Sequence, residues 1–185
     1  SKSNASTWYE AEDLEFSATP DCEIKIQTRK EIAPEEKFNL WTGTGQVLIQ
    51  PKDNGQEMTF TIPVNEPGNY RIDALVTIAP GYGSFSTAVD QKEADISYPE
   101  ITLTEGRDYL SKPKTSMIFD AQKVYKDREN NGIENNIAGS YTVQRITLGT
   151  FETEADHFKV SLTSRDYTPD HSLIGIDQFI VTKKQ

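Results

Sequence analysis

An alternation of apolar and polar residues with a period of two dominates the apolar stretches of this chain and restricts them to β-structure. In Met58 to Ile62, and again in Phe158 to Thr163, every second side chain is apolar. This is the pattern of a strand with one buried face and one face in water. The longest such run, Tyr70 to Ile78, predicts a central strand. A Pro-Gly pair within Asn65 to Asn69 predicts the turn that leads into it.

Further strands are predicted at Ile24 to Gln27, Val47 to Gln50, Ser84 to Val89, Ile101 to Leu103, Thr142 to Leu148 and Leu173 to Val181. Many short strands separated by turn signals indicate a β-sandwich or jelly roll. Helix is expected only as one turn within residues 31–38 and over Phe119 to Arg128. We expect a tag or disordered lead at residues 1–7 and one domain over 8–182, with an elaborated insertion at 107–139.

The charge of the chain excludes several partners. Its 185 residues include 19 Lys and Arg against 29 Asp and Glu, a formal net charge of -10. Such a protein repels nucleic acid and anionic lipid head groups, because affinity for either rises with exposed Lys and Arg. No stretch is long and apolar enough to span a membrane, so we expect no membrane insertion. With 8 Tyr, 8 Phe and 2 Trp, the chain is too aromatic for a disordered acidic tail.

The composition also limits the chemistry. Cys22 is the single cysteine, so neither an intrachain disulfide nor a cysteine-based metal site can form. Only two histidines are present, His157 and His171, which excludes multi-histidine zinc sites and disfavours a serine-type triad. Carboxylates, amides and aromatic rings remain available. No signal peptide precedes the first strand, and Ser3-Asn4-Ala5 resembles a cloning scar, so the sequence itself does not indicate localisation.

Two carboxylates near the start of the chain suggest a cation. Glu10 and Glu12 are two residues apart, so in a strand they would project from the same face and repel each other. Hard oxygen ligands of this kind suit Ca²⁺. Asp177, within an otherwise apolar final strand, needs a partner of its own, and the flexible loop from Leu40 to Gly45 can supply further oxygens. The alternative is that the two glutamates face solvent and Asp177 is satisfied by backbone donors.

At this point the sequence resembles the β-sandwich carbohydrate-binding modules of families 6 and 35, and a variant appended to bacterial glycan-degrading enzymes. The resemblance covers most of residues 8–182, leaves 107–139 outside, and depends on the order and spacing of short motifs. These motifs are Glu10-Ala11-Glu12, Trp41 to Gly45, Glu57 to Val64, Pro67 to Ile72, Ile78 to Gly83, Ile146 to Phe151 and Gly175-Ile176-Asp177.

The resemblance implies an all-β, jelly-roll β-sandwich of two antiparallel sheets with a structural Ca²⁺. Glu10, Glu12 and Asp177 match the side-chain calcium ligands of the family, and backbone carbonyls of the Trp41 to Gly45 loop would complete the shell. The ion would then tie the first and last strands together.

The resemblance also implies a sugar site among the loops at one end of the sandwich, where aromatic rings meet polar groups. The candidates are Trp41, Tyr82, Tyr98, Tyr167 and Asp170. For each aromatic residue a packing role is the alternative, and Trp8 is expected to belong to the core. The family's usual Asn in the Ser164 to His171 loop is replaced here by acids.

These observations predict a non-catalytic carbohydrate-binding module that targets an attached enzyme to a polysaccharide or glycan. We expect a monomer, secreted, periplasmic or at the cell surface, joined to a catalytic domain of the same parent protein. The alternative is a structural accessory domain of a multidomain glycan-degrading enzyme that binds no sugar. A hydrolase or lyase using Asp166 and Asp170 is a third reading.

Two weaker signals remain. Residues Asp127 to Gly132 resemble the first half of a calcium-binding loop, but Ala138 stands where such loops need a bidentate Glu. Asp170 and His171 form a possible catalytic dyad, although no activated nucleophile accompanies them. We therefore expect a polar turn and a solvated loop pair at these two places.

Overall fold

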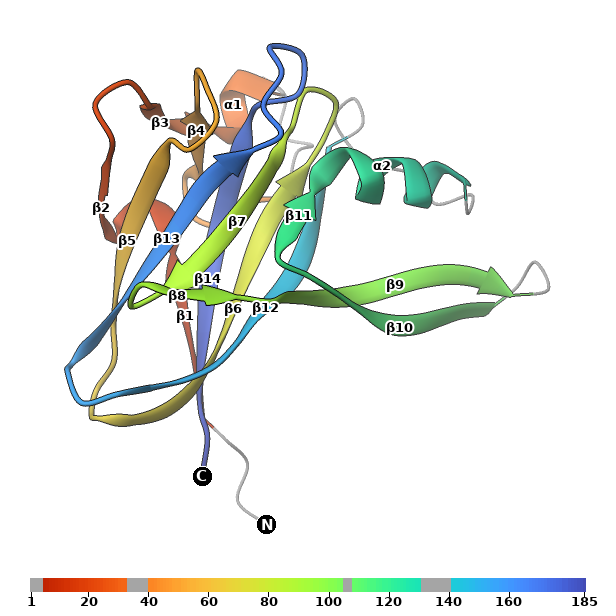
Figure 1. Cartoon of the computed structure of the whole chain (residues 1–185). Helices are drawn as coiled ribbons and strands as arrows, with labels where there is room; N and C mark the ends of the chain where they lie inside the picture. Colours follow the sequence, from red (N-terminus) through yellow and green to blue (C-terminus); the bar gives the residue numbers. More distant parts are fainter. Residues whose placement is uncertain (1–4, 33–39, 105–107, 131–140) are drawn as a thin grey trace.

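The computed structural model describes residues 5–32, 40–104, 108–130 and 141–185, and within these ranges it is a sandwich of two antiparallel β-sheets (Figure 1). The larger sheet has the order β10-β9-β12-β6-β14-β4-β3, with β1 added beside β14. Its strands are β1 (Ser6–Glu10), β3 (Glu23–Thr28), β4 (Gly45–Gln50), β6 (Gly68–Ile78), β9 (Ile96–Thr104), β10 (Asp108–Ser116), β12 (Thr142–Thr153) and β14 (Ile174–Lys183).

The smaller sheet has the order β11-β7-β13-β5-β2, with β8 beside β7. Its strands are β2 (Glu15–Ala18), β5 (Glu57–Pro63), β7 (Ser84–Val89), β8 (Lys92–Ala94), β11 (Ile118–Asp120) and β13 (His157–Arg165). Helices are few: the 3₁₀ turn η1 (Ala11–Asp13), α1 (Arg29–Ile32) and α2 (Ala121–Asn130). Of the helices in the described ranges, none is long and apolar enough to cross a membrane. The predicted two-sheet antiparallel sandwich is therefore confirmed.

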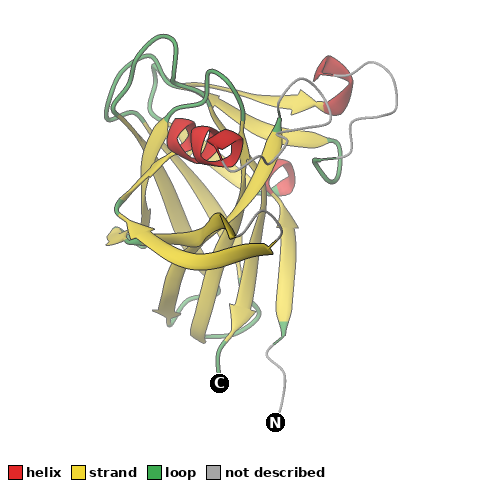
Figure 2. Cartoon of the chain, turned by 90° about the vertical axis from the view of Figure 1, so that its right-hand side faces the viewer, coloured by secondary structure: helices red, strands yellow, loops and turns green. Residues whose placement is uncertain are grey.

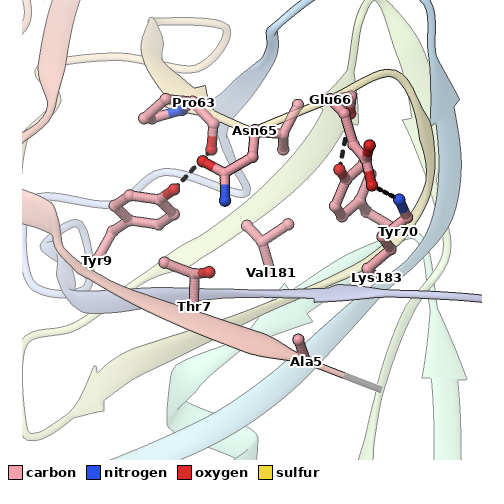
Figure 3. Close-up of a pocket in the computed structure, with 10 residues that line it drawn as sticks. Ala5, Thr7, Tyr9, Pro63, Asn65, Glu66, Tyr70, Val181 and Lys183 are labelled. Atoms are coloured by element: carbon pink, nitrogen blue, oxygen red, sulfur yellow. Dashed lines mark hydrogen bonds and ion pairs between the residues drawn. The ribbon is translucent and has the colours of Figure 1, made fainter. Parts of the chain in front are cut away.

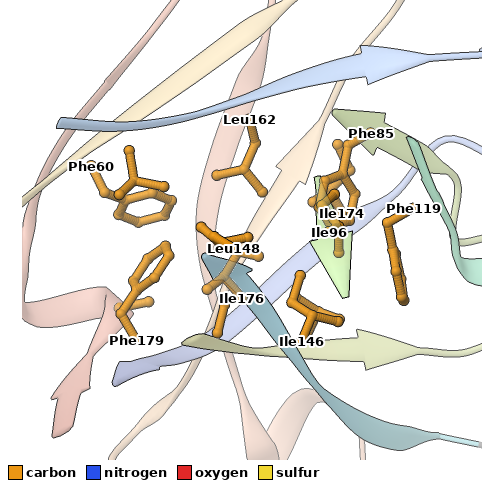
Figure 4. Close-up of a cluster of buried hydrophobic side chains, with 14 of the residues drawn as sticks. Phe60, Phe85, Ile96, Phe119, Ile146, Leu148, Leu162, Ile174, Ile176 and Phe179 are labelled. Atoms are coloured by element: carbon orange, nitrogen blue, oxygen red, sulfur yellow. The ribbon is translucent and has the colours of Figure 1, made fainter. Parts of the chain in front are cut away.

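The alternation seen in the sequence becomes the core between the sheets (Figure 4). Ile72, Ala74, Val76 and Ile78 of β6 are all buried, whereas Leu75 on the opposite face is partly exposed. Across the layer, the rings of Phe60 from the smaller sheet and Phe179 from the larger one meet edge to face at 4.9 Å. Each fully buried side chain of this size contributes about 1.5–3 kcal/mol through the water it sheds. The core therefore fixes the relative position of the sheet ends, where the loops lie.

The start of the module differs from the expectation. Ser6 and Thr7 were assigned to a lead, but they belong to β1 and pair with Thr182 and Val181 of β14. The Ser6 and Thr182 hydroxyls are hydrogen-bonded at 2.8 Å. The described fold thus begins at the edge of the larger sheet and not at Trp8, because backbone pairing needs no apolar side chain. The remainder of the predicted lead, residues 1–4, lies outside the described residues.

The predicted insertion at 107–139 contains β10, β11 and α2. Strands β9 and β10 form a ribbon that projects from the sandwich, and α2 projects on the same side, above the ribbon in the view of Figure 1 (Figures 1 and 2). The predicted helix over 119–128 is confirmed with a shift of two residues. Residues 127–130 of the candidate calcium-binding loop continue this helix, and the rest of that pattern lies outside the described residues, as does most of the expected turn at 31–38.

Candidate functional site

The three acids predicted to bind a cation surround one short loop. Glu10 ends β1, Glu12 lies in η1, and Asp177 lies on β14. The Trp41 loop, which we define as residues 40–44, passes between them. The predicted arrangement of both glutamates on one strand is wrong, because buried Ala11 starts a 3₁₀ turn directly after Glu10. The turn nevertheless directs both carboxylates at the same loop.

Donors of the Trp41 loop satisfy part of this negative charge. The Thr42 amide donates to Asp177 Oδ1 at 3.2 Å, and the Thr42 hydroxyl donates to Glu10 Oε2 at 2.9 Å. The Thr44 amide donates to Glu12 Oε1 at 3.2 Å. The loop therefore presents N–H and O–H groups to the acids. Its Gly43 carbonyl, expected to face an ion, instead accepts a hydrogen bond from Arg29 Nη2 at 2.7 Å.

Glycine at position 43 is favoured by its backbone conformation and allows this close approach. Its φ is +58°, and a Cβ built there would lie 2.6 Å from Glu12 Oε1 and 3.0 Å from Glu10 Oε2. The two carboxylate tips would have to move to admit a side chain, and the left-handed backbone is strained for most other residues. The loop backbone thus approaches the two carboxylates closely because no side chain stands between them.

The carboxylates are incompletely compensated. Asp177 is fully buried, and this burial, followed by the nearby charges of Glu10 and Glu12, raises its pKa from 3.8 to about 7. Burial also raises the pKa of Glu12, whose Oε2 is shielded from water and has no hydrogen-bond partner. A buried carboxylate oxygen without a donor is costly. This end of β14 therefore concentrates negative charge that the described donors do not balance.

An all-oxygen donor set with an orphaned oxygen fits a hard cation such as Ca²⁺. In the described ranges, however, no three His, Cys, Asp or Glu side chains are gathered closely enough to form a metal cluster as they stand. The Thr42 and Thr44 donors hold the acids around the loop and not at a common point. Calcium at Glu10, Glu12 and Asp177 thus stays a prediction, and its chemical basis is the uncompensated charge.

Trp41 and Tyr82, predicted to stack on a sugar, are buried with 1% of their surface exposed, so that prediction is wrong. The Trp41 Nε1–H donates to Thr77 Oγ1 at 2.9 Å, and the Thr77 hydroxyl donates to Gln46 Oε1 at 2.5 Å. Gln46 Nε2 in turn donates to the Tyr82 hydroxyl at 2.9 Å. This buried polar chain joins β4, β6 and both aromatic residues. The two rings are therefore part of the packing.

A residue that the sequence reasoning missed links these two rings. Half-buried Tyr141 meets Trp41 edge to face at 6.1 Å and Tyr82 at 6.2 Å. Burial raises the pKa of Tyr141 and, more strongly, that of Tyr82. The Gly139-Ser140 pair just before Tyr141 was a turn signal that could have directed attention to it.

Tyr98 is also wrongly predicted as a sugar contact. Only 8% of its surface is exposed, and its ring packs edge to face on buried Phe119 of β11 at 5.4 Å. Ser97, its neighbour on β9, pairs with Thr147 of β12. The pleat of the larger sheet therefore turns Tyr98 toward the interior.

The segment between β13 and β14, which we call the Tyr167 loop (residues 166–173), keeps both of its predicted sugar contacts accessible. Tyr167 is half-buried and Asp170 is exposed. The Tyr167 amide donates to Asn54 Oδ1 at 2.8 Å, and the His171 amide donates to the Thr168 carbonyl at 3.1 Å. The loop is therefore held from within and from the β4–β5 turn.

The loop between β6 and β7 packs against the Tyr167 loop. The Gly83 amide donates to the Leu173 carbonyl at 2.8 Å, and the Ser172 amide donates to the Gly81 carbonyl at 2.9 Å. A Cβ at Gly83 would lie 2.6 Å from the His171 carbonyl oxygen, so the two backbones are in direct contact. The Tyr167 loop is thus fixed before any ligand arrives.

The acids considered for catalysis are poorly placed for it. Asp166, Asp170 and His171 are all exposed. A general acid for glycoside hydrolysis is normally shielded from water, which keeps it protonated. Exposure of these groups supports the expected solvated loop.

Trp8 differs from its prediction as a core residue, since 51% of its surface is exposed. It lies opposite Ile180 on the outer face of the larger sheet, while Tyr9 points inward. The Arg145 guanidinium lies 5.5 Å from the Trp8 ring centroid and donates to buried Asp73 Oδ2, with Nη2 at 2.6 Å. A cation over an exposed ring contributes about 0.5–1 kcal/mol. Trp8 thus helps to fasten β1 to the sheet.

Comparison with solved structures shows that the fold is shared. A Paenibacillus xanthan lyase is 13% identical with a TM-score of 0.54, and the match covers 96% of this chain and 13% of that one. The Podospora anserina GH26-CBM35 β-(1,4)-mannanase is 14% identical with a TM-score of 0.50, over 97% of this chain and 28% of that one. A CBM35 from Paenibacillus barcinonensis is 14% identical with a TM-score of 0.47, over 96% and 99% of the two chains.

The chain spans well under two thirds of the lyase and mannanase chains. No protein-family model matches the sequence, and no curated protein is significantly similar to it. At these identities the likeness to the two enzymes shows a common β-sandwich fold.

Proposed function

We propose that this protein is a non-catalytic carbohydrate-binding module, which brings an attached catalytic domain to a polysaccharide or glycan. Three points support the proposal. The fold is shared with parts of two larger enzymes whose names refer to polysaccharides or to an attached carbohydrate-binding module. The acids of the Tyr167 loop lack the shielding that acid catalysis needs. The loop itself is fixed and carries an accessible aromatic ring.

The observation that carries the proposal is the anchored Tyr167 loop. A sugar ring packs its C–H face on an aromatic ring while its hydroxyls bond to nearby polar groups. Tyr167 offers the ring, Asp170 offers acceptors, and the bonds to Asn54 and from Gly83 hold the loop in place. Because the loop is already ordered, binding costs little conformational entropy. A shallow, wet site of this kind is suited to weak binding strengthened by tethering.

Calcium has a structural role in this proposal. Glu10, Glu12 and Asp177 would hold the ion, which supplies the positive charge that the Thr42 and Thr44 donors leave missing. The three acids belong to the first strand, the following turn and the last strand, so the ion would join both ends of the chain. It would take no part in chemistry on the glycan.

A structural accessory domain remains a second candidate, and one observation favours it. Trp41, Tyr82 and Tyr98 are buried and form no exposed aromatic cleft. Such a domain would pack against its catalytic neighbour and bind no sugar. In either case we propose an extracellular, periplasmic or surface location and a monomeric module.

Affinity electrophoresis separates the two candidates. The protein is run through native gels that contain soluble polysaccharides, with β-mannan, xylan, β-1,3-glucan, galactan and xanthan as the panel. We expect retardation by at least one polymer and a loss of that retardation in Tyr167→Ala. If no polymer retards the protein, the accessory-domain candidate holds and the proposed function falls.

A further inference from the structure

A cleft lies at the opposite end of the sandwich from the Tyr167 loop, between the start of β1 and the end of β14 (Figures 1 and 3). Its volume is about 210 Å³. We call it the Asn65 cleft. It is formed by β1, the β5–β6 turn and the end of β14, and its lining residues include Thr7, Tyr9, Asn65, Tyr70, Val181 and Lys183.

Two tyrosines that line the Asn65 cleft are fixed by their own hydroxyls. Half-buried Tyr9 offers ring surface to the cleft, whereas Tyr70 is 6% exposed and packs edge to face on Phe158. Tyr9 donates to the Pro63 carbonyl at 2.8 Å, and Tyr70 donates to the Glu66 carbonyl at 2.7 Å. Burial raises the pKa of Tyr9, so this phenol stays a neutral donor. Both rings are thus held against the turn with their hydroxyls engaged. Between them, buried Val181 provides an apolar floor (Figure 3).

The polar groups of the cleft combine donors and acceptors without a net charge. Lys183 Nζ forms an ion pair with the Glu66 carboxylate, so the two charges cancel. The exposed Asn65 carboxamide hangs over the space between Tyr9 and Val181 (Figure 3). Thr7, which pairs with Val181 across the strands, places a hydroxyl on the same side. An amide and a hydroxyl both donate and accept hydrogen bonds.

We propose that the Asn65 cleft binds one uncharged sugar ring. The half-buried Tyr9 ring and the apolar floor suit the C–H face of a pyranose, while Asn65 and Thr7 suit its hydroxyls. An anionic ligand fits less well, because the only cation lining the cleft is already paired and the protein carries a net charge of -10. This inference rests on the proposed function, since it assigns a second sugar site to the same module.

Two sites at opposite ends would act together on a polymer. If both engage the same or neighbouring chains, the second contact becomes intramolecular and the overall affinity rises without new contacts at either site. The Asn65 cleft is a pocket that accepts a single ring, whereas the Tyr167 loop lies on an open surface. The two sites are therefore expected to differ in the sugars they prefer.

The test is an NMR titration of the ¹⁵N-labelled full chain with glucose, mannose, galactose and xylose, and with glucuronate as the charged comparator. Concentrations up to about 50 mM detect dissociation constants in the millimolar range. We expect saturable amide shifts at Thr7, Tyr9, Asn65 and Lys183 with at least one neutral sugar, and weaker binding of glucuronate. Asn65→Ala is expected to weaken that binding about fivefold, the loss of one hydrogen bond.

The matched control is Asn69→Ala. Asn69 is an exposed amide at the start of β6 that does not line the cleft, so this variant should bind as the unchanged protein does. Amide shifts confined to the Tyr167 loop would contradict a sugar site in the Asn65 cleft but would leave the proposed function intact. Shifts at neither end, together with no retardation by any polysaccharide, would overturn both. If Asn65→Ala and Asn69→Ala weakened sugar binding equally, this would also contradict a sugar site in the Asn65 cleft.

Discussion

The Trp41 loop and the Tyr167 loop offer similar residues, an aromatic ring among acids, yet the structure uses them in opposite ways. In the Trp41 loop the ring is buried and the surrounding carboxylates lack sufficient donors. In the Tyr167 loop the ring stays accessible and the backbone is hydrogen-bonded on both sides. We propose a cation for the first arrangement and a neutral polyol for the second. What a loop binds therefore depends on which of its groups are left unsatisfied.

Calcium should produce the largest change in stability, because it would neutralise the uncompensated carboxylates around the Trp41 loop. At a hundredfold excess over its dissociation constant it should add about 2.7 kcal/mol, or roughly 5–10 °C in Tm. Differential scanning calorimetry with calcium and with a chelator measures this. Asp177→Asn should lose most of the gain, whereas Glu15→Gln, at an exposed acid on β2, should keep it. An equal gain in Asp177→Asn would contradict the assignment.

The buried polar chain behind the Trp41 loop should produce the next largest effect. Thr77→Val keeps the shape of the side chain but removes the acceptor for Trp41 and the donor to Gln46. We expect a loss of about 2 kcal/mol in the free energy of unfolding, measured by urea denaturation. Thr77→Ser retains the hydroxyl and is the matched control. If the two variants were equally stable, the chain would not contribute to stability.

The pH dependence of stability without calcium tests the buried charge of Asp177, with a smaller expected effect. The folded pKa of Asp177 is about 7 against an unfolded value of 3.8, so the folded state binds this proton more tightly. Ionised Asp177 therefore destabilises the fold fully above about pH 7, and this penalty fades as the pH falls toward 3.8. In chelator, the stability difference between Asp177→Asn and the unchanged protein should be greater at pH 8 than at pH 4. A difference independent of pH would contradict the buried charge.

The sequence predicted the sandwich well because alternation reports directly on which strand face is buried. The predicted bounds of strand β7 match the observed ones, and those of β5 and β13 differ by at most two residues at either end. Strands β2, β8 and β11 were not predicted, since three or four residues are too few for alternation to show. Strand β10 was not predicted either, because the nine residues of Asp108–Ser116 do not alternate between apolar and polar. The first strand was expected around Glu10, but its start at Ser6 was not, because Ser6 and Thr7 pair through the backbone at a sheet edge.

The aromatic residues could not be placed from sequence because their partners lie far away along the chain. Trp41 is held by Thr77 and Tyr82 by Gln46, and neither contact leaves a local signal. Trp8 is exposed because β1 turns Tyr9 inward, a choice that depends on its register with β14. The three acids contact the same short loop through Thr42 and Thr44 but do not form a metal cluster as they stand, and a 3₁₀ turn and not a strand carries Glu12.

The most direct test of glycan binding through the Tyr167 loop is isothermal titration calorimetry with the polysaccharide that retards the protein most. Tyr167→Ala should weaken binding about tenfold, or about 1.4 kcal/mol, because the stacking ring is lost. Its free energy of unfolding should change by less than about 0.5 kcal/mol, since the ring is partly exposed. Tyr167→Phe, which keeps the ring, and Trp8→Ala, which removes an exposed ring elsewhere, should bind like the unchanged protein. Unaltered affinity in Tyr167→Ala would contradict the account.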